Sequence, residues 1–167
     1  MALFFWDASA LAKRYTEELG SDVVDALFAA VLRADMATTV WGYTETYAVL
    51  TRRLNADVID LASFEEAVSL LEREIILDAD FHILEVADAT VLSGLSLIRA
   101  HNLNATDAAL LAMLLEFVAD PAAPAPCVLI SADQRFLRAA VAEGLTTLNP
   151  EQTATADIPA WLAALGS

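Results

Sequence analysis

Residues 127–133 read CVLISAD, and this stretch decides the fold class. The segment 127–131 is apolar at consecutive positions, and an aspartate follows it. A strand without polar alternation is typical of a parallel sheet that is covered on both faces. Residues 3–7, LFFWD, repeat this arrangement near the N-terminus. The sequence therefore predicts two buried parallel strands, each with an acid just beyond its carboxyl end.

Weaker strand patterns and helical patterns alternate through the rest of the chain. We expect further strands at 36–40, 82–86 and 145–148, and helices near 9–16, 20–34, 41–54, 63–75, 89–101, 108–118, 134–143 and 158–165. Ser63 and Glu66 form a capping-box pattern, and Thr106 is expected to cap the helix that follows it. Residues 120–126 form a proline-rich loop. This alternation predicts an α/β protein, a three-layer α/β/α domain with a central, mostly parallel sheet.

The composition indicates one folded domain over residues 1–167. The hydrophobic content of 57% argues against disorder. Cys127 is the only cysteine, so no internal disulfide can form and a reducing compartment such as the cytoplasm is expected. No apolar run is long enough for a membrane span, and His82 and His101 belong to no Cys/His cluster typical of structural zinc. The net charge of −15 disfavours simple coating of nucleic acid.

Four acids stand apart from all others in this acidic chain. Windows of eight residues on either side of Asp7, Glu45, Asp107 and Asp133 contain no other Asp or Glu, although the chain has 24. The same windows hold seven of the nine Lys and Arg residues. Their net charge is +3, and that of the rest of the chain is −18. This segregation favours a carboxylate metal site acting on a phosphate-bearing substrate.

Local structure offers a simpler interpretation for three of these acids. Asp7 and Asp133 precede expected helices and could serve only as N-caps. Asp107 lies in a first helical turn, where the helix dipole favours an acid. Glu45 lies in the middle of an expected helix, so capping does not explain it, and its alternative is an ordinary exposed glutamate. Since open parallel sheets place sites beyond the carboxyl ends of their strands, Asp7 and Asp133 should lie on one edge.

Four segments resemble the PIN-domain ribonucleases, especially the VapC-type toxins of bacterial toxin–antitoxin pairs. Their order and spacing extend over essentially the whole domain. The segments are FFWDASALAKRY (4–15), TTVWGYTETYAVL (38–50), NLNATDAALLA (102–112) and VLISADQRFLRAAVAEGL (128–145).

The resemblance implies a PIN fold, an Mg²⁺ or Mn²⁺ site and endonucleolytic cleavage of RNA. It implies a homodimer that a small antitoxin protein holds inactive. The family's acidic quartet matches Asp7, Glu45, Asp107 and Asp133, while Ser131 and Ser9 match its hydroxyl positions. One departure is Thr106, which stands where some toxin-type relatives carry a basic residue.

The leading hypothesis is metal-dependent hydrolysis of phosphodiester bonds. Asp7, Asp107 and Asp133 would bind the metal, Glu45 would complete the shell or orient water, and Ser131 would bond to a carboxylate or to substrate. Phosphate contacts are expected from Lys13, Arg14, Arg52 and Arg135. Two alternatives stay open: a non-catalytic PIN-like protein-binding module, and a stand-alone nuclease without an antitoxin. A phosphotransfer domain is disfavoured because no second acid stands two positions after Asp7.

Overall fold

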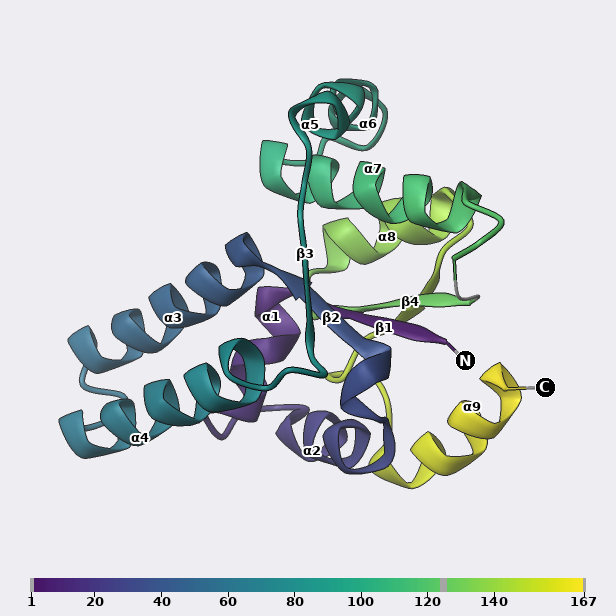
Figure 1. Cartoon of the computed structure of the whole chain (residues 1–167). Helices are drawn as coiled ribbons and strands as arrows, with labels where there is room; N and C mark the ends of the chain where they lie inside the picture. The colour runs from purple at the N-terminus through teal and green to yellow at the C-terminus, as the bar shows by residue number, and fades with distance from the viewer. Residues whose placement is uncertain (1, 124–125, 167) are drawn as a thin grey trace.

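Five parallel strands form one sheet in the order β3-β2-β1-β4-β5, as the computed structural model shows for residues 2–123 and 126–166. The fold is α/β, with helices on both faces of the sheet (Figure 1). The strands are β1 Leu3–Trp6, β2 Met36–Thr39, β3 His82–Leu84, β4 Cys127–Ile130 and β5 Thr146–Leu148. The α-helices are α1 Ala8–Leu11, α2 Ser21–Ala30, α3 Val40–Asn55, α4 Leu61–Leu71, α5 Asp88–Ser93, α6 Leu95–His101, α7 Ala105–Ala119, α8 Gln134–Ala142 and α9 Ile158–Leu165. Shorter helical turns are η1 Ala12–Arg14, η2 Arg33–Asp35, η3 Glu72–Ile76 and η4 Thr155–Asp157.

The alternation of side chains along β1 divides the core into two halves. Phe4 and Trp6 point into a layer built with α1, α2, α4 and α9. Leu3 and Phe5 point to the other face, where α7 and α8 pack on the sheet. All four side chains are buried, which explains why this strand is apolar at every position. The three-layer architecture expected from the sequence is therefore confirmed.

The strand order changes direction between β1 and β4. The chain first builds β2 and β3 on one side of β1, then crosses through α5–α7 to place β4 on the other side. Leu3 pairs with Cys127 and Trp6 pairs with Ile130, so both strands end at the same level. Such a switch point leaves a crevice beyond the strand ends, because the two flanking connections leave in opposite directions. Asp7 and Ser131 are the first residues beyond β1 and β4.

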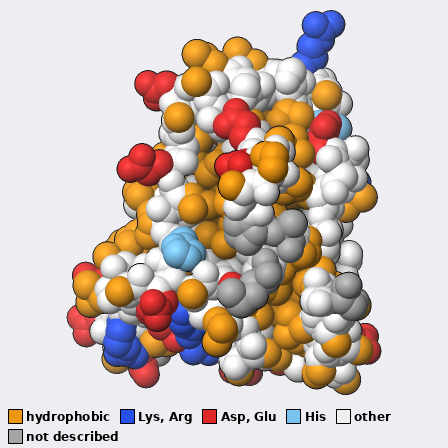
Figure 2. All heavy atoms as spheres, turned by 45° about the vertical axis from the view of Figure 1, so that its right-hand side comes forward, with side chains coloured by type: hydrophobic (Ala, Val, Ile, Leu, Met, Phe, Trp, Pro, Cys, Tyr) orange, Lys and Arg blue, Asp and Glu red, His pale blue; other side chains and the backbone are white. Residues whose placement is uncertain are grey.

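The opposite edge of the sheet has a different surface. Figure 2 turns forward the side of the molecule where both termini lie. Hydrophobic side chains are spread across this face, whereas Lys and Arg side chains lie only near its margins. The visible face therefore offers no concentrated positive charge for binding phosphate.

Two expected helix starts were wrong by a few residues. The helix assigned to a Ser63 cap begins at Leu61, because the Asp60 carboxylate accepts a hydrogen bond from the Ser63 N–H at 2.8 Å. Thr106 lies inside α7, and Asn104 is the cap. Both errors arise because Asp and Asn cap helices as well as Ser and Thr do.

One helix that was expected to be continuous over 89–101 is divided in two. It breaks at Gly94 into α5 and α6. A Cβ at this glycine would lie 2.9 Å from the backbone oxygen of Ala108, so the absence of a side chain at Gly94 allows close packing on α7. The helix expected to run to about residue 34 ends at Ala30, where the chain turns through η2 into β2.

Two further sequence expectations concern a membrane span and the proline-rich loop. Within the described residues, no single helix is both long and apolar enough to cross a membrane. One bent pair, Asp88–His101 with Ala105–Ala119, meets that test by length and composition only. Residues 124–125 of the proline-rich loop lie outside the described residues.

Candidate functional site

The four isolated carboxylates line a single cavity. Asp7 follows β1, Glu45 lies on α3, Asp107 on the first turn of α7, and Asp133 caps α8. The cavity has a volume of about 440 Å³ and lies at the switch point between β1 and β4. Four segments that are distant in the sequence thus bring their acids to one place.

Asp7 is held in place by hydroxyl groups. Its Oδ2 accepts hydrogen bonds from the Ser131 hydroxyl at 2.9 Å, from the Ser9 hydroxyl and from the Ser9 N–H. Ser131 is fully buried, and its hydroxyl also accepts from the Asp133 N–H at 3.0 Å. Ser131 therefore bonds to a carboxylate, as expected, and links the ends of β1 and β4. Among the described residues, none donates a hydrogen bond to the second oxygen, Oδ1.

Asp133 and Asp107 also use one carboxylate oxygen for local structure. Asp133 Oδ1 accepts from the backbone N–H groups of Arg135 and Phe136 at 2.7 and 3.1 Å. Asp107 Oδ2 accepts from the Asn104 side-chain amide at 2.8 Å, and the Asp107 N–H donates back to Asn104 Oδ1 at 2.8 Å. The remaining oxygen of each aspartate accepts no hydrogen bond within the described part of the chain. Capping and ligand binding are therefore compatible at both positions.

Glu45 reaches the cavity because α3 begins directly at the end of β2. Gly42, on the first turn, permits this approach, since a Cβ there would lie 2.2 Å from Thr38 Oγ1. That hydroxyl donates to the Trp6 carbonyl at 2.7 Å and ties β2 to β1. Glu45 itself is exposed, and no described residue forms a hydrogen bond or ion pair with it. Its carboxylate is available to a ligand.

Desolvation and the charges of neighbouring acids raise the pKa values of two of these carboxylates, Asp107 and Glu45. Burial, followed by the neighbouring charges of Asp7, Asp133 and Glu45, raises the pKa of Asp107 from 3.8 to about 7, while the hydrogen bond from Asn104 opposes the shift. Although Glu45 is exposed as a residue, its pKa is raised first by partial desolvation of its carboxylate in the cavity and second by Asp7, while Arg52 opposes the shift. Like charges so placed favour either protonation or a bound cation.

Of the four expected phosphate-binding residues, only Arg52 lines the cavity. It is exposed and forms no ion pair with the described residues. Arg135 is also exposed, and its guanidinium donates to the Asn102 carbonyl at 3.3 Å. Lys13 is buried and lies 2.7 Å from Glu151, and Arg14 pairs with Glu74 and Asp25 at 2.8 and 2.7 Å. Lys13 and Arg14 therefore neutralise acids of the protein itself.

The donor set fits Mg²⁺ or Mn²⁺ by chemistry. All four side chains offer carboxylate oxygens, the ligands that hard divalent cations prefer. Within residues 2–123 and 126–166, however, no group of three Asp, Glu, His or Cys side chains is arranged to hold a metal ion directly. Mg²⁺ usually keeps several waters, so these residues fit an ion held partly through its water shell.

Comparison with known proteins identifies a similar fold. The crystal structure of PAE2754 from Pyrobaculum aerophilum superposes with a TM-score of 0.61, at 18% sequence identity over 98% of this chain and 99% of that one. This similarity shows a shared fold alone. No family model and no curated protein matches the sequence.

Two residues that support the site were not predicted for these roles. Asn104 caps α7 and bonds to Asp107, and its position three residues before that acid is the signal that favours a cap. Gly42 permits the close approach of α3 to Thr38, four residues earlier in β2, and a glycine near the start of an expected helix is the signal that could have indicated it.

Proposed function

We propose that this protein is a metal-dependent endoribonuclease that hydrolyses phosphodiester bonds in RNA. One observation carries the proposal: carboxylates from four separate segments converge on one cavity that an unpaired arginine also lines. Such an arrangement sets four carboxylates against the single cation Arg52 among the described lining residues, and an Mg²⁺ ion would balance the remaining negative charge and bind a phosphate group. The resemblance of the four segments to PIN-domain ribonucleases supports the choice of RNA.

In this proposal Asp7, Asp107 and Asp133 would hold one or two Mg²⁺ or Mn²⁺ ions, and Ser131 would keep Asp7 in position. When bound, the ions would neutralise a phosphoryl oxygen and acidify a bound water. Glu45 would orient the attacking water and accept its proton as the new O–P bond forms. The leaving oxygen would take a proton from solvent as its bond to phosphorus breaks. Arg52 would contact a non-bridging phosphate oxygen.

The proposal is tested by making the same substitution at two aspartates that both cap helices, Asp133 and Asp60. Asp133→Asn and Asp60→Asn each replace an N-cap acid with asparagine, which caps equally well, but only Asp133 lines the cavity. We expect Mg²⁺-dependent cleavage of labelled RNA to fall by about 10²–10³-fold in Asp133→Asn, a loss typical of a removed transition-state contact, and to stay unchanged in Asp60→Asn. Asp7→Asn should behave like Asp133→Asn. Full activity in Asp7→Asn and Asp133→Asn would reject the assignment.

A non-catalytic protein-binding module is the second candidate. It is favoured by the ion pairs that occupy Lys13 and Arg14, and by the charge of −18 outside the four acidic windows, which suits a basic partner. Titration calorimetry distinguishes the two functions. Absence of Mg²⁺ and Mn²⁺ binding, together with absence of RNA cleavage, would favour the protein-binding module.

We also propose a cytoplasmic location, a homodimer and a small antitoxin partner, all on the strength of the family resemblance. The single buried Cys127 is compatible with a reducing compartment. A short antitoxin-like gene next to this one, whose product co-purifies with the protein and inhibits it, is the expected result. Active protein with no such neighbour would favour the stand-alone nuclease.

A further inference from the structure

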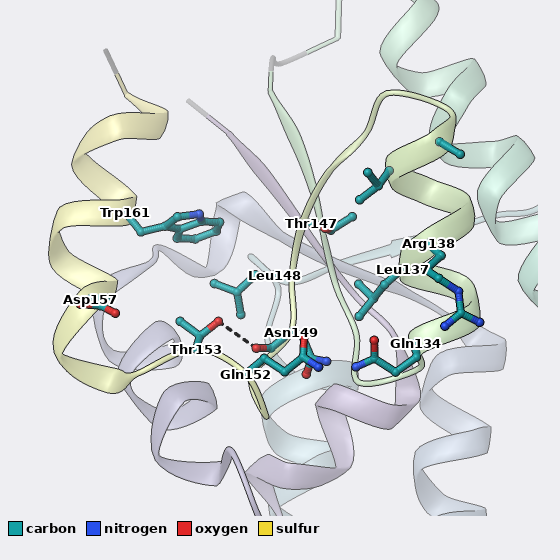
Figure 3. Close-up of a pocket in the computed structure, with 12 residues that line it drawn as sticks. Gln134, Leu137, Arg138, Thr147, Leu148, Asn149, Gln152, Thr153, Asp157 and Trp161 are labelled. Atoms are coloured by element: carbon teal, nitrogen blue, oxygen red, sulfur yellow. Dashed lines mark hydrogen bonds between the residues drawn. The ribbon is translucent and has the colours of Figure 1, made fainter.

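A second cleft lies between α8 and α9, along the outer edge of β5 (Figure 3). Its volume of about 840 Å³ is within the range of small-ligand sites. Leu137, Leu148 and Trp161 supply apolar surface, and Trp161 faces the strand from α9. Three amide side chains and two threonines supply neutral hydrogen-bonding groups: Gln134, Asn149, Gln152, Thr147 and Thr153.

One of these amides is buried without its full set of partners. Asn149 is only 8% exposed, and its Oδ1 accepts from the Glu151 N–H at 2.9 Å, which fixes which end of the amide is nitrogen. Its Nδ2 has no hydrogen-bond partner within the described residues. Buried amide donors are nearly always paired. The nitrogen has almost no exposed surface in the unbound protein, so a rotation of the side chain would let a ligand in the cleft satisfy it.

The backbone of β5 adds a second donor and an acceptor. The Leu148 carbonyl accepts from the Ser131 N–H at 3.2 Å and so faces β4. Because the peptide groups of a strand alternate in direction, Thr147 directs its N–H and C=O toward the open edge. Within the described sheet β5 pairs only with β4, so these groups lie along the cleft.

The cleft is next to the carboxylate cavity. Gln134 lines the cleft, and its immediate neighbour Asp133 lines the cavity. Figure 3 shows Gln134, Asn149 and Gln152 gathered at one end of the cleft. Asn149 follows β5 as Asp7 follows β1, so this end lies at the carboxyl edge of the sheet. A chain that crosses the cavity can therefore place its next unit between α8 and α9.

We propose that this cleft binds a nucleobase of single-stranded RNA beside the phosphate that is cleaved, an inference that rests on the proposed function. Amides and backbone groups pair with base edges, and apolar side chains cover base faces. Neutral contacts of this kind suit a protein in which few cations near the site are free. Arg138, exposed and without an ion pair in the described structure, lies at the rim of the cleft for a flanking phosphate.

Binding without cleavage tests the cleft by itself. Glu45→Gln protein, free of divalent metal, is titrated with RNA tetranucleotides that differ at one position. We expect affinities that depend on the base. In this background Gln134→Ala, at an exposed position, and Asn149→Asp, which keeps the acceptor but removes the donor, should each weaken binding at least tenfold and reduce base selectivity. Asn55→Ala is the matched control, since Asn55 is an exposed amide far along α3. This substitution should change neither the affinity for RNA nor the base selectivity.

The outcomes separate the cleft from the proposed function. Base-selective binding, with no cleavage by the wild-type protein in Mg²⁺ or Mn²⁺, would overturn the proposed nuclease function and support nucleobase binding in the cleft. If Gln134→Ala and Asn149→Asp cleave RNA with the same sequence preference as the wild-type protein, nucleobase binding in the cleft is overturned and the nuclease function is supported. If both variants bind RNA normally but change the sedimentation of the protein, the cleft is a protein interface and the nucleobase proposal is wrong.

Discussion

At the scale of single residues, the two carboxylate oxygens of each aspartate in the cavity have different surroundings. One oxygen accepts hydrogen bonds from neighbouring backbone, amide or hydroxyl groups, and the other is not engaged by the described residues. The engaged oxygen fixes the direction of the carboxylate, which reduces the ordering that a ligand must impose when it binds. The hydroxyl of Ser131 is central because it serves Asp7 and Asp133 together.

Removal of that hydroxyl gives the first prediction. Ser131→Ala leaves an Asp7 oxygen short of a donor in a buried place, so we expect the free energy of unfolding to fall by about 1–3 kcal/mol. Ser96→Ala is the matched control: this serine is exposed, its hydroxyl donates only to the Ser93 carbonyl, and a change within about 0.5 kcal/mol is expected. Urea denaturation measures both. Equal stability of the two variants would contradict the bridging role of Ser131.

The second prediction concerns Asp107 and pH. Its folded-state pKa of about 7 lies above its ordinary value of 3.8. Between these values the folded protein retains a proton that the unfolded chain releases, so this group lowers stability as pH rises from about 4 to 7. Asp107→Asn removes that effect and keeps an acceptor for Asn104. Without divalent metal, we expect the variant to be more stable than wild type by roughly 1–2 kcal/mol at pH 8, after allowance for solvent screening, and equal to it near pH 4.

Denaturation curves at several pH values, with EDTA present, measure this difference. Added Mg²⁺ should then stabilise wild type more than Asp107→Asn, since a ligand of the native state raises stability by mass action. A gap between the two proteins that is the same at pH 4 and pH 8 would show that Asp107 does not titrate between those values.

At the scale of elements, the junction of β2 with α3 places Glu45. Gly42→Ala would bring a Cβ to 2.2 Å from Thr38 Oγ1, so the helix or the threonine must move. Overpacking of this kind costs about 1–3 kcal/mol, which is our third prediction. Thr38→Ala removes the obstructing hydroxyl, so the double variant should lose less stability than the sum of the two single losses. Gly166→Ala, where the nearest atom is the Ala163 oxygen at 3.9 Å, is the control. Additive losses in the double-mutant cycle would contradict the proposed clash.

The positions of the strands and of most helices could be predicted from the sequence, because their signals are local. The apolar runs at 3–6 and 127–130 identify β1 and β4, and the acids beyond them identify the edge on which a site lies. The close approach of Gly94 to α7 could not be predicted, because it involves the backbone of Ala108 in another helix. The unpaired donor of Asn149 was missed for a similar reason, since its burial in the folded chain has no local sequence signal.

At the scale of the whole molecule, charge is distributed so that few cations can serve a ligand. Lys13 and Arg14 appeared in the sequence as positive charge near an acid, but each is drawn into ion pairs with acids from distant segments. Sequence spacing predicted that they lie near Asp7 and gave no information on their partners. Arg52 and Arg135 are the exposed members of the predicted set. With Arg138 at the rim of the neighbouring cleft, the protein therefore presents three candidate phosphate contacts within an overall charge of −15.

This count predicts an unusually weak salt dependence of RNA binding. Affinity for single strands falls with salt in proportion to the number of neutralised phosphates, with a slope of about −0.7 for each, so three contacts give a slope of about −2.1. Fluorescence anisotropy of labelled RNA on the Glu45→Gln protein measures the slope across salt concentrations. Arg52→Ala and Arg135→Ala should each reduce it by about 0.7, whereas Arg73→Ala, an exposed arginine on η3, should not. A slope steeper than about −4 would require a broad basic surface, and the described residues provide none beside the cavity, so RNA would have to bind elsewhere on the protein.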